Sequence, residues 1–77
     1  MELITIYRSD NEKINLMGPW AKEENVAYVF GMEQGYNFLY IMIISVEEFN
    51  ENFKASGYGF IPIRKYGYVK LQRKPIS

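Results

Sequence analysis

The chain contains neither cysteine nor histidine. Without thiols it has no disulfide framework and no thiolate zinc site, so its core depends on side-chain packing alone. The same absences remove the commonest general base, the commonest metal ligand and the best nucleophile. The side chains of the adjacent acidic pairs Glu23–Glu24 and Glu47–Glu48 point apart, and the sequence has no glycine-rich phosphate loop. We therefore expect a protein that is not an enzyme and that holds no metal or cofactor.

Two kinds of segment are also missing. No charged N-terminal region precedes a hydrophobic stretch, so the sequence predicts no secretion signal. The apolar run Phe38–Ile44 is too short to span a bilayer. With cysteine absent as well, these features predict a cytoplasmic protein without membrane contact. Alanine is scarce, whereas Ile, Tyr, Phe, Asn and Lys are common. Because AT-rich codons encode such a composition, we expect a low-GC bacterium or its phage as the source.

The length and composition predict one domain, residues 1–77. A chain of this size buries only about 60% of its unfolded surface, so its core provides a narrow margin of stability. The sequence is 48% hydrophobic and 17% aromatic, which is rich enough for a packed core.

The formal net charge is zero, but the charges are segregated along the chain. All nine acidic residues lie between Glu2 and Glu51, and none follows Phe53. From Phe53 onward there are six bases, namely Lys54, Arg64, Lys65, Lys70, Arg73 and Lys74. Such asymmetry is typical of an interaction surface, and the alternative is that the two halves pair in the fold and neutralise each other.

The clearest helix signal begins at Ser45. Ser45 and Glu48 match the capping-box pattern, in which a serine precedes a glutamate by three residues. Phe49 and Phe53 follow at the spacing of one apolar helical stripe. Gly57 can take the left-handed conformation that ends a helix. The pattern predicts a helix over residues 46–56.

Apolar patterns predict strands over residues 2–8, 13–17, 26–32, 36–45, 58–63 and 66–73. The first two and the next two should pair as hairpins. We expect the stretch 36–45 to be central. Both of its side-chain rows are apolar, so the inner row is either Phe38, Tyr40, Met42 and Ile44 or Leu39, Ile41 and Ile43. The predicted fold is an α+β domain, a mainly antiparallel sheet of five to six strands with the helix over 46–56 packed on one face.

The only tryptophan, Trp20, follows the Gly18–Pro19 turn. One interpretation is a loop residue folded onto the core, where an indole covers a large apolar area. The other is a binding anchor, because tryptophan is enriched at interaction hot spots.

Residues 64–71 combine aromatic and basic side chains. The stretch resembles the aromatic signature of the RNA recognition motif, which is matched by Arg64, Tyr66, Gly67, Tyr68 and Val69. That family requires another helix and strand after this signature, and only six residues follow Leu71, so the chain is not a member. Exposed tyrosines flanked by bases are still what a single strand or a nucleotide stacks upon. Alternatively, they pack on a neighbouring strand at a solvated edge.

Three functions compete at this point. The first is a small non-enzymatic binding protein of inhibitor or adaptor type, encoded by a phage or mobile element, that acts through protein–protein interaction. The second is nucleic-acid or nucleotide binding through the basic C-terminal strand, which overall neutrality disfavours. The third is a structural subunit that forms a homodimer through a sheet edge. The predicted partner-binding residues are Trp20, Tyr58, Arg64, Lys65, Tyr66, Tyr68, Lys70 and Arg73.

Overall fold

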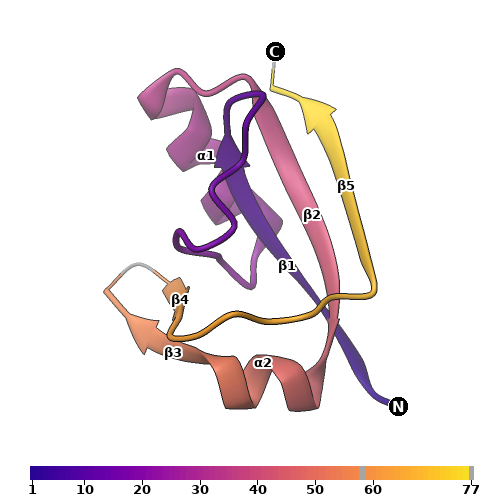
Figure 1. Ribbon diagram of the computed structural model, residues 1–77. Coiled ribbons are helices and arrows are strands. Elements are labelled where there is room, and N and C mark those ends of the chain that lie inside the picture. The colour runs from indigo at the N-terminus through magenta and orange to yellow at the C-terminus, as the bar shows by residue number, and fades with distance from the viewer. Residues whose placement is uncertain (58, 77) are drawn as a thin grey trace.

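A computed structural model describes residues 1–57 and 59–76 and has an α+β fold (Figure 1). The elements are β1 (Leu3–Asp10), α1 (Glu24–Gln34), β2 (Phe38–Ser45), α2 (Val46–Asn52), β3 (Phe53–Ser56), β4 (Gly59–Pro62) and β5 (Lys70–Pro75). One antiparallel sheet has the order β1-β2-β5, and β3 pairs with β4 in a second. The predicted class and the central place of β2 are confirmed. The single sheet of five to six strands and the single helix are wrong, because the described residues form two sheets and two helices.

The segment Trp20–Ala21 joins the two sheets. Ala21 exchanges two backbone hydrogen bonds with Tyr7 on the free edge of β1, each with an N–O distance of 2.8 Å. Trp20 exchanges two with Phe60 of β4, at 2.7 and 2.8 Å. Backbone hydrogen bonding therefore continues from β5 through β2 and β1 to β4 and β3, and the chain curls around one core.

The predicted strand over 26–32 is instead part of α1. The small residues Ala27 and Gly31, four positions apart, lie on one side of this helix and are buried. A Cβ atom on Gly31 would lie 2.5 Å from Cβ of Ser9, so only glycine lets α1 approach β1 this closely. Gly35, with φ 75°, ends the helix in a left-handed cap and not in a hairpin. The strand prediction failed because the alternation of large and small residues also suits a helix that packs through its small ones.

The predicted strand over 13–17 is a loop, so β1 pairs with β2 and not with its neighbour in sequence. The Asp10 carboxylate accepts hydrogen bonds from the backbone N–H groups of Asn11 and Asn15, at 2.8 and 2.9 Å. The Tyr40 hydroxyl donates to the Asn11 carbonyl at 2.6 Å. Side chains thus take over backbone groups that a hairpin would have paired, and they tie the loop to the sheet.

Helix α2 starts where the sequence predicts and ends four residues early. The Ser45 hydroxyl accepts a hydrogen bond from the Glu48 N–H at 3.1 Å, which confirms the N-cap. Extended backbone begins at Phe53, whose pairing with Pro62 starts β3. The ring of Phe53 still stacks on Phe49, with 4.9 Å between centroids. The β3–β4 pairing outcompetes the last helical turn, and Gly57, with φ 46°, lies in the turn between these strands.

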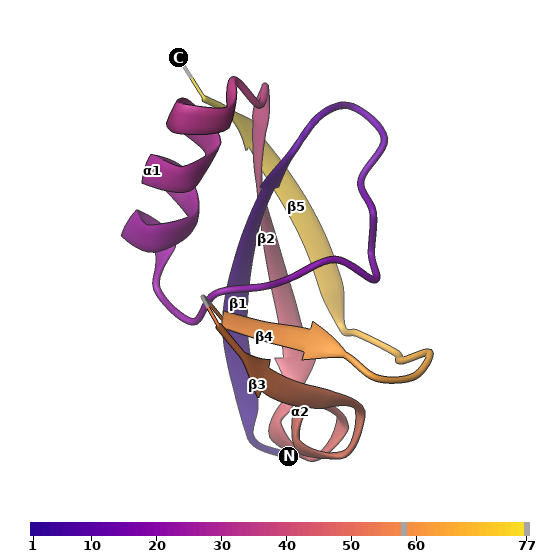
Figure 2. The same ribbon diagram turned by 90° about the vertical axis from the view of Figure 1, so that its left-hand side faces the viewer.

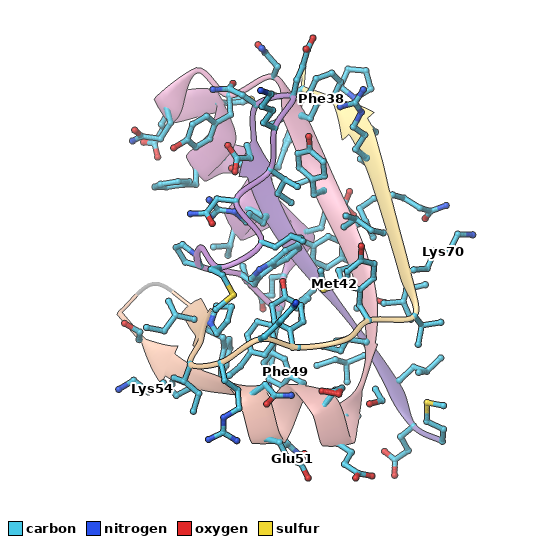
Figure 3. All side chains as sticks on the ribbon, in the orientation of Figure 1. Phe38, Met42, Phe49, Glu51, Lys54 and Lys70 are labelled. Atoms are coloured by element: carbon cyan, nitrogen blue, oxygen red, sulfur yellow. The ribbon has the colours of Figure 1, made fainter. Side chains whose placement is uncertain are left out.

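The inner face of the three-stranded sheet carries the core. The row of β2 that points inward is Tyr40, Met42 and Ile44, with Phe38 partly buried at its end. Phe49 of α2 packs against this row, and Figure 3 labels Phe49 together with Met42 of the row. Trp20, Phe53 and Ile6 of β1 complete the buried cluster. The sequence left this row and the alternative row open, and the structure selects the one that faces α2.

The two faces of this sheet are covered unequally (Figure 2). The loop over residues 11–19, the β3–β4 pair and α2 lie over the inner face. On the opposite, outer face, α1 covers one end, where Ser9 and Leu39 are buried. At the other end of β1, Leu3 is 49% exposed. The outer face is therefore only partly shielded from solvent by the described residues.

Ser45→Ala should lower the free energy of unfolding by about 1 kcal/mol, because the Glu48 N–H loses its acceptor at the helix end. Ser9→Ala is the matched control. The Ser9 hydroxyl is buried without a hydrogen-bond partner among the described residues, so its removal should be neutral or stabilising. Urea melts of both variants test this. Equal losses for the two serines would contradict the cap.

Candidate protein-interaction surface

Two of the predicted contact residues are not at the described surface. Trp20 is only 1% exposed and lies in the core, where its indole N–H donates to the Leu16 carbonyl at 3.4 Å. This is the core interpretation of the tryptophan. Tyr58 lies outside the described residues.

Tyr66 points inward and anchors the chain between β4 and β5. Its hydroxyl donates to the Leu16 carbonyl at 2.6 Å, and its ring lies 4.7 Å from that of Phe53, centroid to centroid. Burial raises the pKa of the Tyr66 phenol to about 12. A tyrosine held in this way offers no free ring for stacking on a base.

The other predicted residues are exposed, namely Arg64, Lys65, Tyr68, Lys70 and Arg73. The Arg73 guanidinium lies over the ring of Phe38, with 4.1 Å from Cζ to the centroid. Neighbouring Lys74 forms an ion pair with Glu24 of α1 at 2.6 Å. Within residues 1–57 and 59–76, that pair is the one salt bridge between the basic C-terminal part and an acidic residue. Internal neutralisation therefore accounts for Lys74 and leaves Arg64, Lys65 and Lys70 without an acidic partner there.

We call residues 63–70 the binding segment. Three apolar or aromatic side chains in it are exposed: Ile63 by 46%, Tyr68 by 43% and Val69 by 58%. They lie beside the three bases that have no acidic partner, because Ile63 precedes Arg64 and Lys65, and Val69 precedes Lys70. Of these side chains, exposed tyrosine and arginine are the types enriched at protein contact sites.

The backbone of the binding segment is held at both ends. The Ile63 N–H donates to the Asn52 carbonyl at 2.7 Å, and the Val69 N–H donates to the Ile43 carbonyl at 2.8 Å. Tyr66 fixes its middle through the bond to Leu16. An irregular connection fixed at three points presents its exposed side chains with little entropy left to lose.

The predicted last strand over 66–73 is shifted in the structure to Lys70–Pro75. Residues 66–69 are irregular because Tyr66 leaves the strand direction to reach the core. β5 pairs with β2 on one side only, and it carries three bases and Pro75. Charged residues and proline on an edge strand disfavour strand addition. The free edge of β1 is occupied at Tyr7 by Ala21.

The described residues contain no group of three or more acidic side chains that could hold a metal ion. No helix in the described part of the chain is long and apolar enough to cross a membrane. A shallow hollow between α1 and β5 is lined by Glu24, Asn25, Tyr28, Leu39, Lys74, Pro75 and Ile76. The two charged residues of this lining, Glu24 and Lys74, form the ion pair described above.

Sequence reasoning missed one apolar surface. The strand predicted over residues 26–32 gave no indication that Val26, Val29, Phe30 and Met32 would be exposed on a helix. Two features of the sequence indicated a helix. Gly35 is a residue that can end a helix in the left-handed conformation, and the small residues Ala27 and Gly31 stand four positions apart. In a helix, the same residues leave four apolar side chains exposed to solvent.

Tyr66→Phe should lower the free energy of unfolding by about 1 kcal/mol at pH 8, because the hydrogen bond to Leu16 is lost. The raised pKa means that the folded state holds the phenol proton more tightly than the unfolded state, whose pKa is 10.0. This stabilisation is complete below pH 10 and is lost as the pH rises through about 12. The difference between wild type and variant should therefore shrink above pH 10 in urea melts. A constant difference from pH 8 to pH 12 would contradict the burial of Tyr66, and Tyr68→Phe, with an exposed phenol, should cost nothing at pH 8.

Comparisons of the chain with protein-family models, with curated proteins and with solved structures gave no match. What the protein does must therefore be argued from the geometry and chemistry of its own residues.

Proposed function

We propose that this chain is a small non-enzymatic binding protein, of inhibitor or adaptor type, that contacts another protein through the binding segment. One observation carries the proposal. The segment exposes Ile63, Tyr68 and Val69 among three bases that have no acidic partner in the described structure. Exposed aromatic and apolar groups beside unpaired positive charge favour a partner with an acidic rim around an apolar pocket.

The fixed backbone of the segment supports the same proposal. Binding through a mobile loop costs the free energy of ordering it, whereas a held segment avoids most of that cost. Tyr68 then acts as the central anchor, because a tyrosine combines a large contact area with few rotatable bonds. Arg64, Lys65 and Lys70 would surround it and steer an acidic partner.

The chemistry of the segment supports nucleic-acid binding less well. Of the two tyrosines that could have stacked on bases, Tyr66 is used in the core. Arg73 is stacked on Phe38, Lys74 is paired with Glu24, and the formal net charge is zero. The bases also do not form one stripe, since Lys54 and Lys70 lie on opposite sides of the molecule (Figure 3). A protein partner is therefore the better-supported proposal.

Capture of partners by the full chain in its cell of origin, with and without nuclease, tests the proposal. A partner retained after nuclease treatment is expected to be a protein. For that partner, Tyr68→Ala should weaken binding by about 2 kcal/mol, mostly through faster dissociation. Met17→Ala, which truncates an exposed apolar side chain elsewhere, is the matched control and should change nothing. Unchanged binding by Tyr68→Ala would remove the binding segment as the site.

Salt titration distinguishes the two kinds of partner. Binding to a protein through Tyr68 should fall little between about 50 and 200 mM salt, whereas multiple phosphate contacts lose orders of magnitude in affinity over this range. If the partner were a nucleic acid, Lys70→Ala would weaken binding to all sequences alike and lower the salt slope by roughly one. Lys13→Ala, at an exposed base outside the segment, serves as the control.

A further inference from the structure

The exposed surface of α1 carries several large apolar side chains, with Asn25 and Glu33 among them. Ala27 and Gly31 face the sheet and are buried. Four large side chains around the rest of the helix are 43–55% exposed, namely Val26, Val29, Phe30 and Met32. We call these four residues the α1 patch. A helix that stays in water normally carries polar residues on its exposed side.

A second apolar area lies on the outer face of the sheet, beyond the end of α1. Leu3, Thr5, Ile41 and Ile43 share this face, as the pairing register of β1 with β2 shows, and we call them the bare patch. No element formed by the described residues covers it (Figure 2). Strand β2 is apolar in both of its rows, a pattern typical of strands that are buried on both faces. In one copy of the chain, Ile41 and Ile43 remain only half-buried.

The two patches have matching dimensions. The eleven residues of α1 make a helix about 16 Å long. The eight residues of β1 extend about 27 Å, so α1 spans little more than half of the outer face. A two-fold axis that lies parallel to this face and perpendicular to the strands would place each α1 over the uncovered half of the other sheet.

We propose that two copies of this chain form a homodimer in which the α1 patch of each protomer packs on the bare patch of its partner. The contact occurs twice and is isologous, as a closed two-fold dimer requires. It buries the outer apolar row of β2, whose inner row is already in the core, and it removes four exposed apolar side chains of α1 from water. This surface adjoins the binding segment at Lys70, which pairs with Ile43, and does not include the proposed anchor Tyr68.

Charge favours a second copy as the occupant. The formal net charge is zero, so two copies do not repel each other as wholes. Glu33 stands beside the α1 patch, and Lys70 lies in the same cross-strand row as Ile43 at the margin of the bare patch. Neither forms a salt bridge with another described residue. In the dimer, Glu33 of each protomer lies near Lys70 of the other.

The size that a stable contact requires is a modest share of the surface. A stable interface takes roughly 800 Å² from each partner, about a sixth of the 5080 Å² that this chain exposes. The outward side of an eleven-residue helix and half of a three-stranded face contribute together on each protomer. A small domain with a narrow margin of stability gains from such burial, because its own core is limited.

Sedimentation equilibrium of the full chain tests the dimer. The wild type should sediment at twice its mass of 9.1 kDa. Val29→Glu on the α1 patch and Leu3→Glu on the bare patch should each raise the dissociation constant about tenfold or more, because each buries an unpaired charge in the interface. Met17→Glu is the matched control, since Met17 is similarly exposed at 47% but lies in the loop over the inner face. Circular dichroism melts verify that the three variants fold.

Several results would overturn the proposal. One is a wild type that stays monomeric up to about 100 μM, where a micromolar complex forms. Another is a dimer that Val29→Glu dissociates but Leu3→Glu does not, which would place helix against helix. Equal weakening by Met17→Glu would also overturn it. Tyr68→Ala, on the binding segment, should leave the dimer intact, so this proposal and the proposed function fail on different variants.

Discussion

The pairing of Trp20–Ala21 with both sheets holds this fold together. These two residues fill the backbone hydrogen bonds at the middle of the β1 edge and, on their other side, those of Phe60. An unpaired edge there would expose backbone groups, and β3–β4 would lose its backbone link to the three-stranded sheet. The link also places the indole of Trp20 in the core and starts α1 behind the sheet. Gly59 lies against the Trp20 carbonyl so tightly that a side chain at this position would have no room.

Polar side chains fix the long loop that leads to this link. Arg8 donates to the Pro19 carbonyl at 2.9 Å and to the Asp10 carboxylate at 3.1 Å, and both side chains are largely shielded from solvent. Burial alone would raise the pKa of Asp10, but the N–H groups of Asn15 and Asn11 and the Arg8 charge outweigh it and lower the pKa. The Leu16 carbonyl accepts from both Trp20 and Tyr66. The loop is irregular yet held by specific bonds, which is how it can pass over the core without regular structure.

The candidate site was only partly predictable. Basic and aromatic residues near the C-terminus predict a contact surface from the sequence, and the structure leaves Arg64 and Tyr68 exposed. Pattern alone could not separate Tyr68 from Tyr66, because alternation in a strand puts both on one side. In the fold, the chain leaves strand geometry and Tyr66 turns to the Leu16 carbonyl. The same limit applies to Trp20, whose burial depends on Phe60, forty residues away in sequence.

The sequence by itself determined the α+β class, the central strand and the start of α2, because each depends on neighbouring residues. The Ser45 cap is a hydrogen bond between residues three positions apart. The apolar run of β2 can be recognised in the sequence without knowing what packs against it. Tertiary structure decided the secondary structure of residues 26–32, whose sequence is compatible with both a helix and a strand. Gly31, which has no Cβ, lets the helix pack closely on Ser9, and this contact between distant residues is not visible in the local pattern. It also decided that α2 ends at Asn52, because Phe53 gains a strand partner, Pro62, that no local pattern reveals.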